Sequence, residues 1–346
     1  MDVIEYLESI QGLRAIDRTV SAQAVSPDDN GVLKYPAFFP ITDVDTTVVG
    51  DITIGNYRPV ASRREWNGPS RLIPVKTPEI RDVEILPVES HFTIAEKEMQ
   101  KLEEQSNGVE SIILERMGAT VEGRTDGLAE ANYRRVELDA FRVWANGALV
   151  QDDPQTGRVV ETDFQFGSDR QQAAGTTWSD SNAYDNLLDW LKDGVAAVGR
   201  IEGVVLSGSV FAMVKKSGPT VNGKTLKRSE LEDEIADELG NQFRFVQNDD
   251  TLDPFVDGGT KTTNELIWPV KKVAAIPAGG RIGIAAKAPV VRSGQLSRSF
   301  PEARIERNGM AVYYTSLNEG KGAKVSAQIN LMAISNKGKI WTIDVA

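Results

Sequence analysis

The pattern of apolar and polar residues changes several times along the chain. Residues 2–11 carry apolar side chains at helical spacing, whereas residues 17–50 show no periodicity and contain several prolines. Short β-type runs follow in residues 45–62 and 70–88, and prolines in them would remove ladder hydrogen bonds. The Asn67-Gly68 pair between the runs is typical of a hairpin turn. The pattern therefore predicts an extended N-terminal arm and a long hairpin of edge-type strands.

Three helices are predicted in the next part of the chain. Thr93 and Glu96 have the spacing of a capping box and mark the start of the first helix. The second covers residues 109–118 and ends at a glycine. The third runs from about residue 127 to residue 148, and the alternating stretch 158–166 after it predicts a half-buried strand.

The third helix has the strongest pattern of the three. Its apolar residues recur at three- and four-residue steps, and oppositely charged residues stand four positions apart. We expect Tyr133, Phe141 and Trp144 to lie in a core. Arg134 and Arg142 should face solvent or a neighbouring molecule. Such a helix would be a stiff rod of roughly 30 Å.

A second group of elements follows. Residues 184–198 predict an amphipathic helix, and residues 201–214 are apolar enough for a buried strand. Ser229 and Glu232 have capping-box spacing ahead of a helix that ends at Gly240. The inward side chains of the first helix are expected to be Leu187, Leu191, Val195 and Val198.

The last third of the chain is rich in strand patterns. Residues 244–248, 267–277 and 280–289 complete a mixed layer of helices and strands. The C-terminal stretch 323–346 predicts two strands joined at residues 336–338.

Composition narrows the class of function. The 346 residues carry a formal net charge of -11, which argues against nucleic acid as a bound ligand because phosphate binding needs clustered Lys and Arg. The chain has no cysteine, which excludes disulfides and thiolate metal sites. The N-terminus lacks the features of a signal peptide, and no apolar run reaches the roughly 20 residues that cross a bilayer. We expect a soluble intracellular protein with no membrane segment.

Candidate catalytic and ligand-binding motifs are few. His91 is the only histidine and has no second His or Cys with which to share a metal. The glycine-rich stretch 277–283 lacks the strand–turn–helix context of a phosphate loop, so we interpret it as a turn. The acidic stretch 248–259 lacks the ligand spacing of a calcium loop and is interpreted as solvated. We expect no enzyme activity, cofactor or metal; an acidic α/β hydrolase with an unrecognised site is the alternative.

An extended arm, a hairpin without a core and a rigid helix are hard to reconcile with one compact monomer. Ordering such protrusions costs conformational entropy that is offset only if a neighbour covers them. Proteins that exchange arms and hairpins form large, self-complementary contacts. The pattern therefore favours a subunit of an assembly.

The order of these elements resembles the major capsid proteins of tailed bacteriophages, most closely the lambda-like capsid protein E family. The resemblance covers nearly the whole chain. It includes the arm, the hairpin with a glycine at its tip, a helix ending near WANGALV, the segment TTWSDSNAYDNLLDWL and the C-terminal strands. It implies an α+β fold of the Hong Kong 97 type, with an N-terminal arm, an E-loop (the hairpin), a peripheral (P) domain containing a spine helix, and an axial (A) domain.

The resemblance also implies how the chain is divided. The expected segments are 1–47 for the arm, 48–92 for the E-loop, 93–177 for the P domain with its spine helix, 178–310 for the A domain, and 311–346 for C-terminal strands that return to the P domain.

The implied function is structural. The resemblance implies a virion protein that self-assembles into hexamers and pentamers of an icosahedral head, enclosing double-stranded DNA without sequence-specific binding. Expected partners are other copies of the chain and the portal, scaffolding and decoration proteins, with assembly in the host cytoplasm. Only about fifty residues precede the hairpin, so scaffolding is expected from a separate protein unless this is a mature form. The alternative is an encapsulin-like nanocompartment shell of the same fold.

The hairpin tip is the candidate contact between subunits. Trp66 stands there among charged residues, and aromatic and arginine side chains are typical interface anchors because they bury large areas and pair with carboxylates. In the alternative interpretation Trp66 folds back on its own strands and the arginines are solvated. The candidate interface residues are Arg63, Arg64, Glu65, Trp66 and Arg71.

Overall fold

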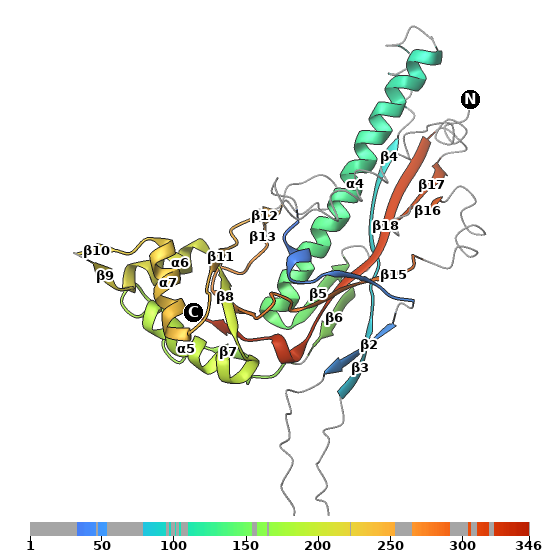
Figure 1. Ribbon diagram of the computed structural model, residues 1–346. Coiled ribbons are helices and arrows are strands. Elements are labelled where there is room, and N and C mark those ends of the chain that lie inside the picture. The colour runs from blue at the N-terminus through green and yellow to red at the C-terminus, as the bar shows by residue number, and fades with distance from the viewer. Residues whose placement is uncertain are drawn as a thin grey trace, which may run out of the picture.

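Two sheets and one long helix dominate the protein (Figure 1). The long helix runs beside the larger sheet, and shorter helices pack around the smaller sheet. The computed structural model describes residues 33–45, 48–53, 79–94, 97, 101, 104, 110–153, 158–164, 166–221, 223–252, 265–290, 304–305, 310–317 and 322–345.

The larger sheet is organised around one long strand, β18 (Gly322–Ser335). The first half of β18 pairs antiparallel with β17 (Ala311–Leu317) and with β4 (Val88–Ile94). Its second half pairs antiparallel with β15 (Gly283–Ala288). The remaining strands of this sheet are β16 (Arg304–Ile305), beside β17, and β1 (Ile41–Asp43), parallel to β15.

The long helix, α4, is continuous from Glu110 to Asn146. The prediction of two separate helices, with a stop at Gly118 and a new start near Gly127, was wrong. A glycine inside a helix costs only about 1 kcal/mol relative to alanine, and it ends a helix only where the backbone turns left-handed. That happens at Gly147, with φ of 68°, directly after the helix. The 37 residues make a rod of about 55 Å.

The predicted capping box at Thr93 was also wrong, because Thr93 lies in strand β4 and pairs with Lys324 of β18. Side chains of β4 alternate in exposure and end at the buried Ile94. Without β4, the first half of β18 would have unpaired backbone groups on one side. The tertiary pairing therefore overrides the local signal for a helix start.

The smaller sheet has the strand order β11-β8-β14-β19-β7. Its core is formed with the side chains of three helices that follow or connect these strands. The strands are β7 (Gln171–Ala173), β8 (Ile201–Leu206), β11 (Phe245–Gln247), β14 (Lys272–Pro277) and β19 (Thr342–Asp344). The helices are α5 (Ala183–Val198), α6 (Gly208–Ser217) and α7 (Arg228–Leu239).

Helix α5 agrees with the amphipathic pattern except at one position. Leu187, Leu191 and Val198 are buried as predicted, but Val195 is 37% exposed. The buried neighbour is Gly194, which lies against the indole of Trp341. Close approach of Trp341 to the helix backbone shifts the buried face by one residue.

The apolar stretch 201–214 is not a single strand as predicted. Strand β8 ends at Leu206, and Ser207 caps α6, its Oγ lying 3.4 Å from the Val210 nitrogen. The carboxylate of Asp249 accepts the N–H of Gly208 at 2.7 Å. A continuous apolar run suits a buried strand and a buried helix equally, so periodicity alone could not separate them.

The capping box of α7 is displaced from its predicted position. The Glu230 carboxylate accepts the N–H of Lys227 at 2.6 Å, whereas Glu232 accepts the N–H of Phe245 in β11 at 2.7 Å. Glu232 therefore joins α7 to the edge of the sheet. Gly240, with φ of 67°, ends α7 as predicted.

The two sheets do not follow the expected segment boundaries. Strand β15, from the expected A segment, lies in the larger sheet, and β19, from the C-terminal segment, lies in the smaller one. The short 3-10 helix η2 (Lys337–Lys339) lies between β18 and β19, which belong to different sheets and do not pair with each other. After β14 the chain crosses from one sheet to the other twice. Strand β14 pairs with β19 in the smaller sheet, and β15 and β18, which lie between them in sequence, pair with each other in the larger sheet.

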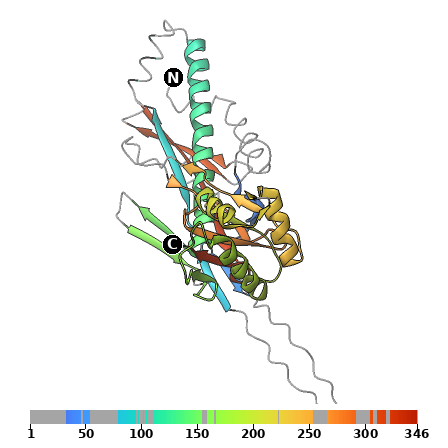
Figure 2. The ribbon, with the colours of Figure 1, turned by 90° about the vertical axis from the view of Figure 1, so that its left-hand side faces the viewer.

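Four two-stranded ladders complete the described structure, and one of them forms the base of the expected E-loop. The hairpin of β5 (Ala148–Asp153) and β6 (Arg158–Asp163) follows α4 and stands out from the body in Figure 2. In the smaller-sheet part, β9 (Thr220–Val221) pairs with β10 (Lys224–Thr225), and β12 (Thr251–Leu252) pairs with β13 (Glu265–Leu266). The stretch 277–283 is a turn between β14 and β15, with left-handed glycines at 279 and 280.

Candidate assembly surfaces

The base of the expected E-loop is a ladder of β2 (Val48–Thr53) and β3 (Glu79–Glu84). In the part of the chain that is described, neither strand pairs with a third one. Val83 and Ile85, at the inner end, are buried in the large core, and the ladder extends away from both sheets (Figure 1). A lone two-stranded ladder is marginally stable in water, so this projection is a candidate contact surface.

The predicted interface residues at the E-loop tip lie outside the described residues. They are Arg63, Arg64, Glu65, Trp66 and Arg71. Their role stays a prediction from composition, and the structure adds only that the ladder leading to them projects from the body.

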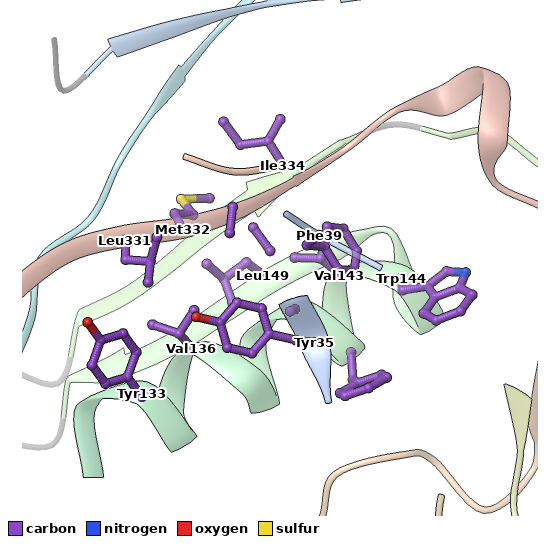
Figure 3. Close-up of a cluster of buried hydrophobic side chains, with 14 of the residues drawn as sticks. Tyr35, Phe39, Tyr133, Val136, Val143, Trp144, Leu149, Leu331, Met332 and Ile334 are labelled. Atoms are coloured by element: carbon purple, nitrogen blue, oxygen red, sulfur yellow. The ribbon is translucent and has the colours of Figure 1, made fainter. Parts of the chain in front are cut away.

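The lower half of α4 carries the predicted core residues. Tyr133, Phe141 and Trp144 are each at most 3% exposed. The rings of Trp144 and Trp268 meet edge-on with centroids 5.6 Å apart, and Phe141 meets Trp268 at 6.1 Å. Figure 3 shows Tyr133 near Leu331 of β18 at one end of the cluster and Trp144 at the other end. This packing fixes α4 as the rigid element of the larger body.

The arginines of α4 differ in environment. Arg134 is exposed and pairs with Glu130 at 2.5 Å, one turn earlier. Arg142 is half-buried, and burial lowers the pKa of its guanidinium, with Arg135 adding to the effect. Arg134 is thus the one placed on the surface, while Arg142 sits at the edge of the core.

Two buried carboxylates on α4 were missed in the sequence. Asp139 is 4% exposed and pairs with Arg135 at 3.0 Å. Glu137 is 5% exposed and lies one turn from both Tyr133 and Phe141, on the same apolar face. A charge inside an apolar stripe was the signal that could have identified Glu137, since such a group needs a partner when buried.

The described residues offer little for catalysis. No three His, Cys, Asp or Glu side chains among them are placed to hold a metal ion. His91 is an exposed residue of β4, opposite Ser326. An open hollow of about 700 Å³ at the end of α7 is lined by Glu202, Asp233, Asp237 and Arg244 among others. None of the helices in the described parts is long and apolar enough to cross a membrane.

Comparison with known proteins points to one kind of fold. No family model and no curated protein matches the sequence. A solved candidate capsid protein from a prophage of E. coli CFT073 is similar, with a TM-score of 0.56 and 10% identity over 97% of this chain and 99% of that one. A phage-related protein of Bordetella bronchiseptica RB50 is similar with a TM-score of 0.51 and 11% identity, over 95% and 96% of the two chains.

These likenesses define the class of fold. The protein has the α+β fold of phage capsid proteins, and the expectation of a Hong Kong 97 type fold is confirmed. At such low identity the likeness concerns the fold alone.

Proposed function

We propose that the protein is the major capsid protein of a tailed bacteriophage, a structural subunit rather than an enzyme. The observation that carries the proposal is the likeness to a candidate prophage capsid protein over almost the full length of both chains. It is supported by the projecting β2–β3 ladder, a form that is marginal unless another molecule covers it.

The subunits would form hexamers and pentamers of an icosahedral shell around double-stranded DNA, in a virion assembled in the host cytoplasm. A net charge of -11 suits a shell that encloses DNA without binding it tightly, because like charges repel. Portal and scaffolding proteins, and a decoration protein, are the further partners that such a shell implies. The hairpin tip with Trp66 and its arginines would dock on an acidic surface of a neighbouring subunit.

Negative-stain electron microscopy and sedimentation velocity of the purified full-length protein test the proposal. Closed shells, sheets or tubes are expected. Dispersed particles near 37.8 kDa at all concentrations would contradict assembly.

The content of particles isolated from the native host separates a phage head from an encapsulin-like compartment. Nuclease-resistant double-stranded DNA inside the shells is expected for the phage head. A protein cargo without DNA would instead support the compartment, which neither of the two phage-derived likenesses favours.

A further inference from the structure

The segment 33–45, which we call the strap, contributes buried side chains to the large core. Its side chains Tyr35 and Phe39 are fully buried, and Phe38 lies with its ring centroid 4.9 Å from that of Trp144. Figure 3 shows Tyr35 and Phe39 among side chains from α4 and β18. The strap therefore covers the aromatic face of α4, the expected spine helix.

Backbone hydrogen bonds continue the strap along the edge of the larger sheet. The N–H of Ile282 donates to the carbonyl of Phe38 at 2.9 Å, and the N–H of Ala285 donates to that of Pro40 at 3.0 Å. Val44 donates to the carbonyl of Lys287 at 2.9 Å, so β1 is a parallel edge strand with only three residue pairs. Such a short edge strand contributes few hydrogen bonds. The strap is therefore held in place mainly by its buried side chains and by the contacts of its first residues.

The first residues of the strap are held by a buried carboxylate. The backbone N–H of Lys34 donates to Oε1 of Glu137 at 2.5 Å, and the backbone N–H of Tyr35 bonds to the same carboxylate. These N–H groups open the 3-10 helix η1 (Tyr35–Ala37), where an anion is favoured by the unpaired donors. Glu137 is thus the polar anchor of a segment about one hundred positions away.

A second carboxylate meets the same strap residue from another direction. The ammonium of Lys34 pairs with Asp250, which follows β11 of the smaller sheet. The carbonyl of Asp250 accepts the N–H of Ile267, next to Trp268 in the aromatic cluster. Lys34 is therefore the junction of the strap, the spine helix and the smaller-sheet part of the protein.

We propose that the strap is a closing element whose seating is coupled to proton uptake at Glu137. When the strap is seated, Glu137 is removed from water, and burial penalises a carboxylate more than a neutral acid. A proton on Glu137 removes that penalty while leaving an oxygen to accept from the strap. The strap should seat more tightly at acidic pH and open more readily as Glu137 ionises.

Burial decides this direction, and the groups around Glu137 act on its pKa in both senses. Burial is the largest effect and raises the pKa of Glu137; the backbone N–H groups of Lys34 and Tyr35 and the Lys34 ammonium oppose it, and Asp250 adds to it. Tyr133 and Tyr35 face the same site, and burial raises the pKa of Tyr133 to about 12 and that of Tyr35 further. Both tyrosines therefore stay neutral, and only carboxylates change charge between acidic and neutral pH.

The sign follows from linkage. Because the pKa of Glu137 is higher with the strap seated than in water, the seated form binds more protons between the ordinary glutamate pKa and the raised value. Strap seating is therefore strongest below this window and weakens as pH rises through it.

Hydrogen exchange of the full-length protein tests the coupling. Protection factors of amides in residues 33–45, corrected for intrinsic exchange rates, should fall roughly tenfold between about pH 5 and about pH 8. Glu137→Gln, which keeps an acceptor oxygen but cannot ionise, should show high protection at both pH values. Amides of β8 in the smaller sheet serve as an internal reference.

Two further variants separate the coupling from a general loss of structure. Glu130→Gln removes an exposed carboxylate of the same helix and should keep the wild-type pH dependence. Asp250→Asn should lower strap protection about two- to fivefold at both pH values, since the Lys34 pair is half exposed and weak.

Two results would overturn the proposal. One is a wild-type strap whose protection is the same at both pH values. The other is a Glu137→Gln protein that keeps the wild-type slope or loses strap protection at every pH, which would make Glu137 a plain anchor. The coupling does not rest on shell formation, because the contacts between Glu137 and the strap lie within one subunit. The two tests also have different readouts: the shell test measures particle size, and this one measures amide exchange.

Discussion

The two cores of the protein are built in different ways. The spine core, around α4 and the larger sheet, gathers side chains from the strap, β4, α4, β15 and β18, which are scattered from residue 33 to residue 340. The axial core, around α5, α6, α7 and the smaller sheet, draws mainly on residues 178–245, closed by strands β14 and β19. The spine core depends on long-range contacts that must be formed against loop-closure entropy, whereas most axial contacts are between neighbours in sequence.

The cores also differ in how they treat charge. The spine core contains the buried carboxylates Glu137 and Asp139, each held by a specific partner. In the axial part, helix α7 keeps Asp233, Glu234 and Asp237 exposed. In the axial part the carboxylates that accept backbone N–H groups, Glu232 and Asp249, are less deeply buried. Burial penalises a charged carboxylate, so the spine core is expected to respond more strongly to protonation than the axial core.

The largest expected effect comes from Trp144→Ala, which opens a cavity in the spine core. Loss of this fully buried ring should cost about 3–5 kcal/mol of unfolding free energy. Hydrogen exchange should show lost protection in the strap and β18, with α5 and β8 still protected. Trp144→Phe, which keeps a ring, should cost less. An unchanged melting curve for Trp144→Ala would contradict the prediction that this ring stabilises the spine core.

A smaller effect is expected in the axial core from Gly194→Ala. A Cβ there would lie 2.5 Å from Nε1 of Trp341, whose indole donates to the carbonyl of Trp190 at 3.1 Å. Overpacking of this kind costs about 1–3 kcal/mol. Denaturant unfolding measures the cost, and the strap should keep its protection. Gly175→Ala, which meets nothing within 4 Å, is the matched control and should be nearly neutral.

A modest gain is expected from Gly127→Ala in α4. Gly127 is exposed inside the helix, and a Cβ would meet nothing within 4 Å, so alanine should stabilise by about 0.5–1 kcal/mol. Gly240→Ala should do the opposite, because φ at Gly240 is 67° and alanine is strained there. Thermal unfolding of the two variants side by side checks both signs. A loss of stability in Gly127→Ala would mean that the glycine serves a contact beyond this one chain.

The smallest effect on the fold, and the sharpest test of the proposed assembly, is expected at the hairpin tip. The double variant Trp66→Ala with Arg64→Glu should leave the melting temperature nearly unchanged and abolish closed shells, because the proposed contact lies between chains. Trp66→Phe should assemble. Electron microscopy and thermal unfolding of the same preparations give both readouts. Normal shells from the double variant would contradict the proposal that the hairpin tip holds neighbouring subunits together.

Several elements were predictable because their signals are local. The helix expected at residues 184–198 is α5, Ala183–Val198, since its apolar spacing is a property of one continuous segment. The glycine at 240 ends α7, because few other residues adopt its left-handed backbone readily. The resemblance in the order of elements was sufficient to identify the capsid fold, although no single motif carries it.

Other elements could not be read from local patterns. Glycines that suggested two helices lie inside one helix, because packing against β18 and β4 offsets their cost along α4. Thr93 has cap spacing yet pairs in a sheet. In both cases a contact with a segment more than a hundred residues away decided the outcome.

The sequence by itself determined the buried face of α4 around Phe141 and Trp144, the buried face of α5 apart from Val195, the acidity and the poverty of catalytic motifs. Only the tertiary structure decided that the C-terminal strands separate into two sheets and that Glu137 receives the backbone of Lys34. The physical reason is that periodicity reports which face of an element is buried, but not what covers it. A buried carboxylate and its donor become recognisable as partners only when the folded chain brings them within hydrogen-bonding distance.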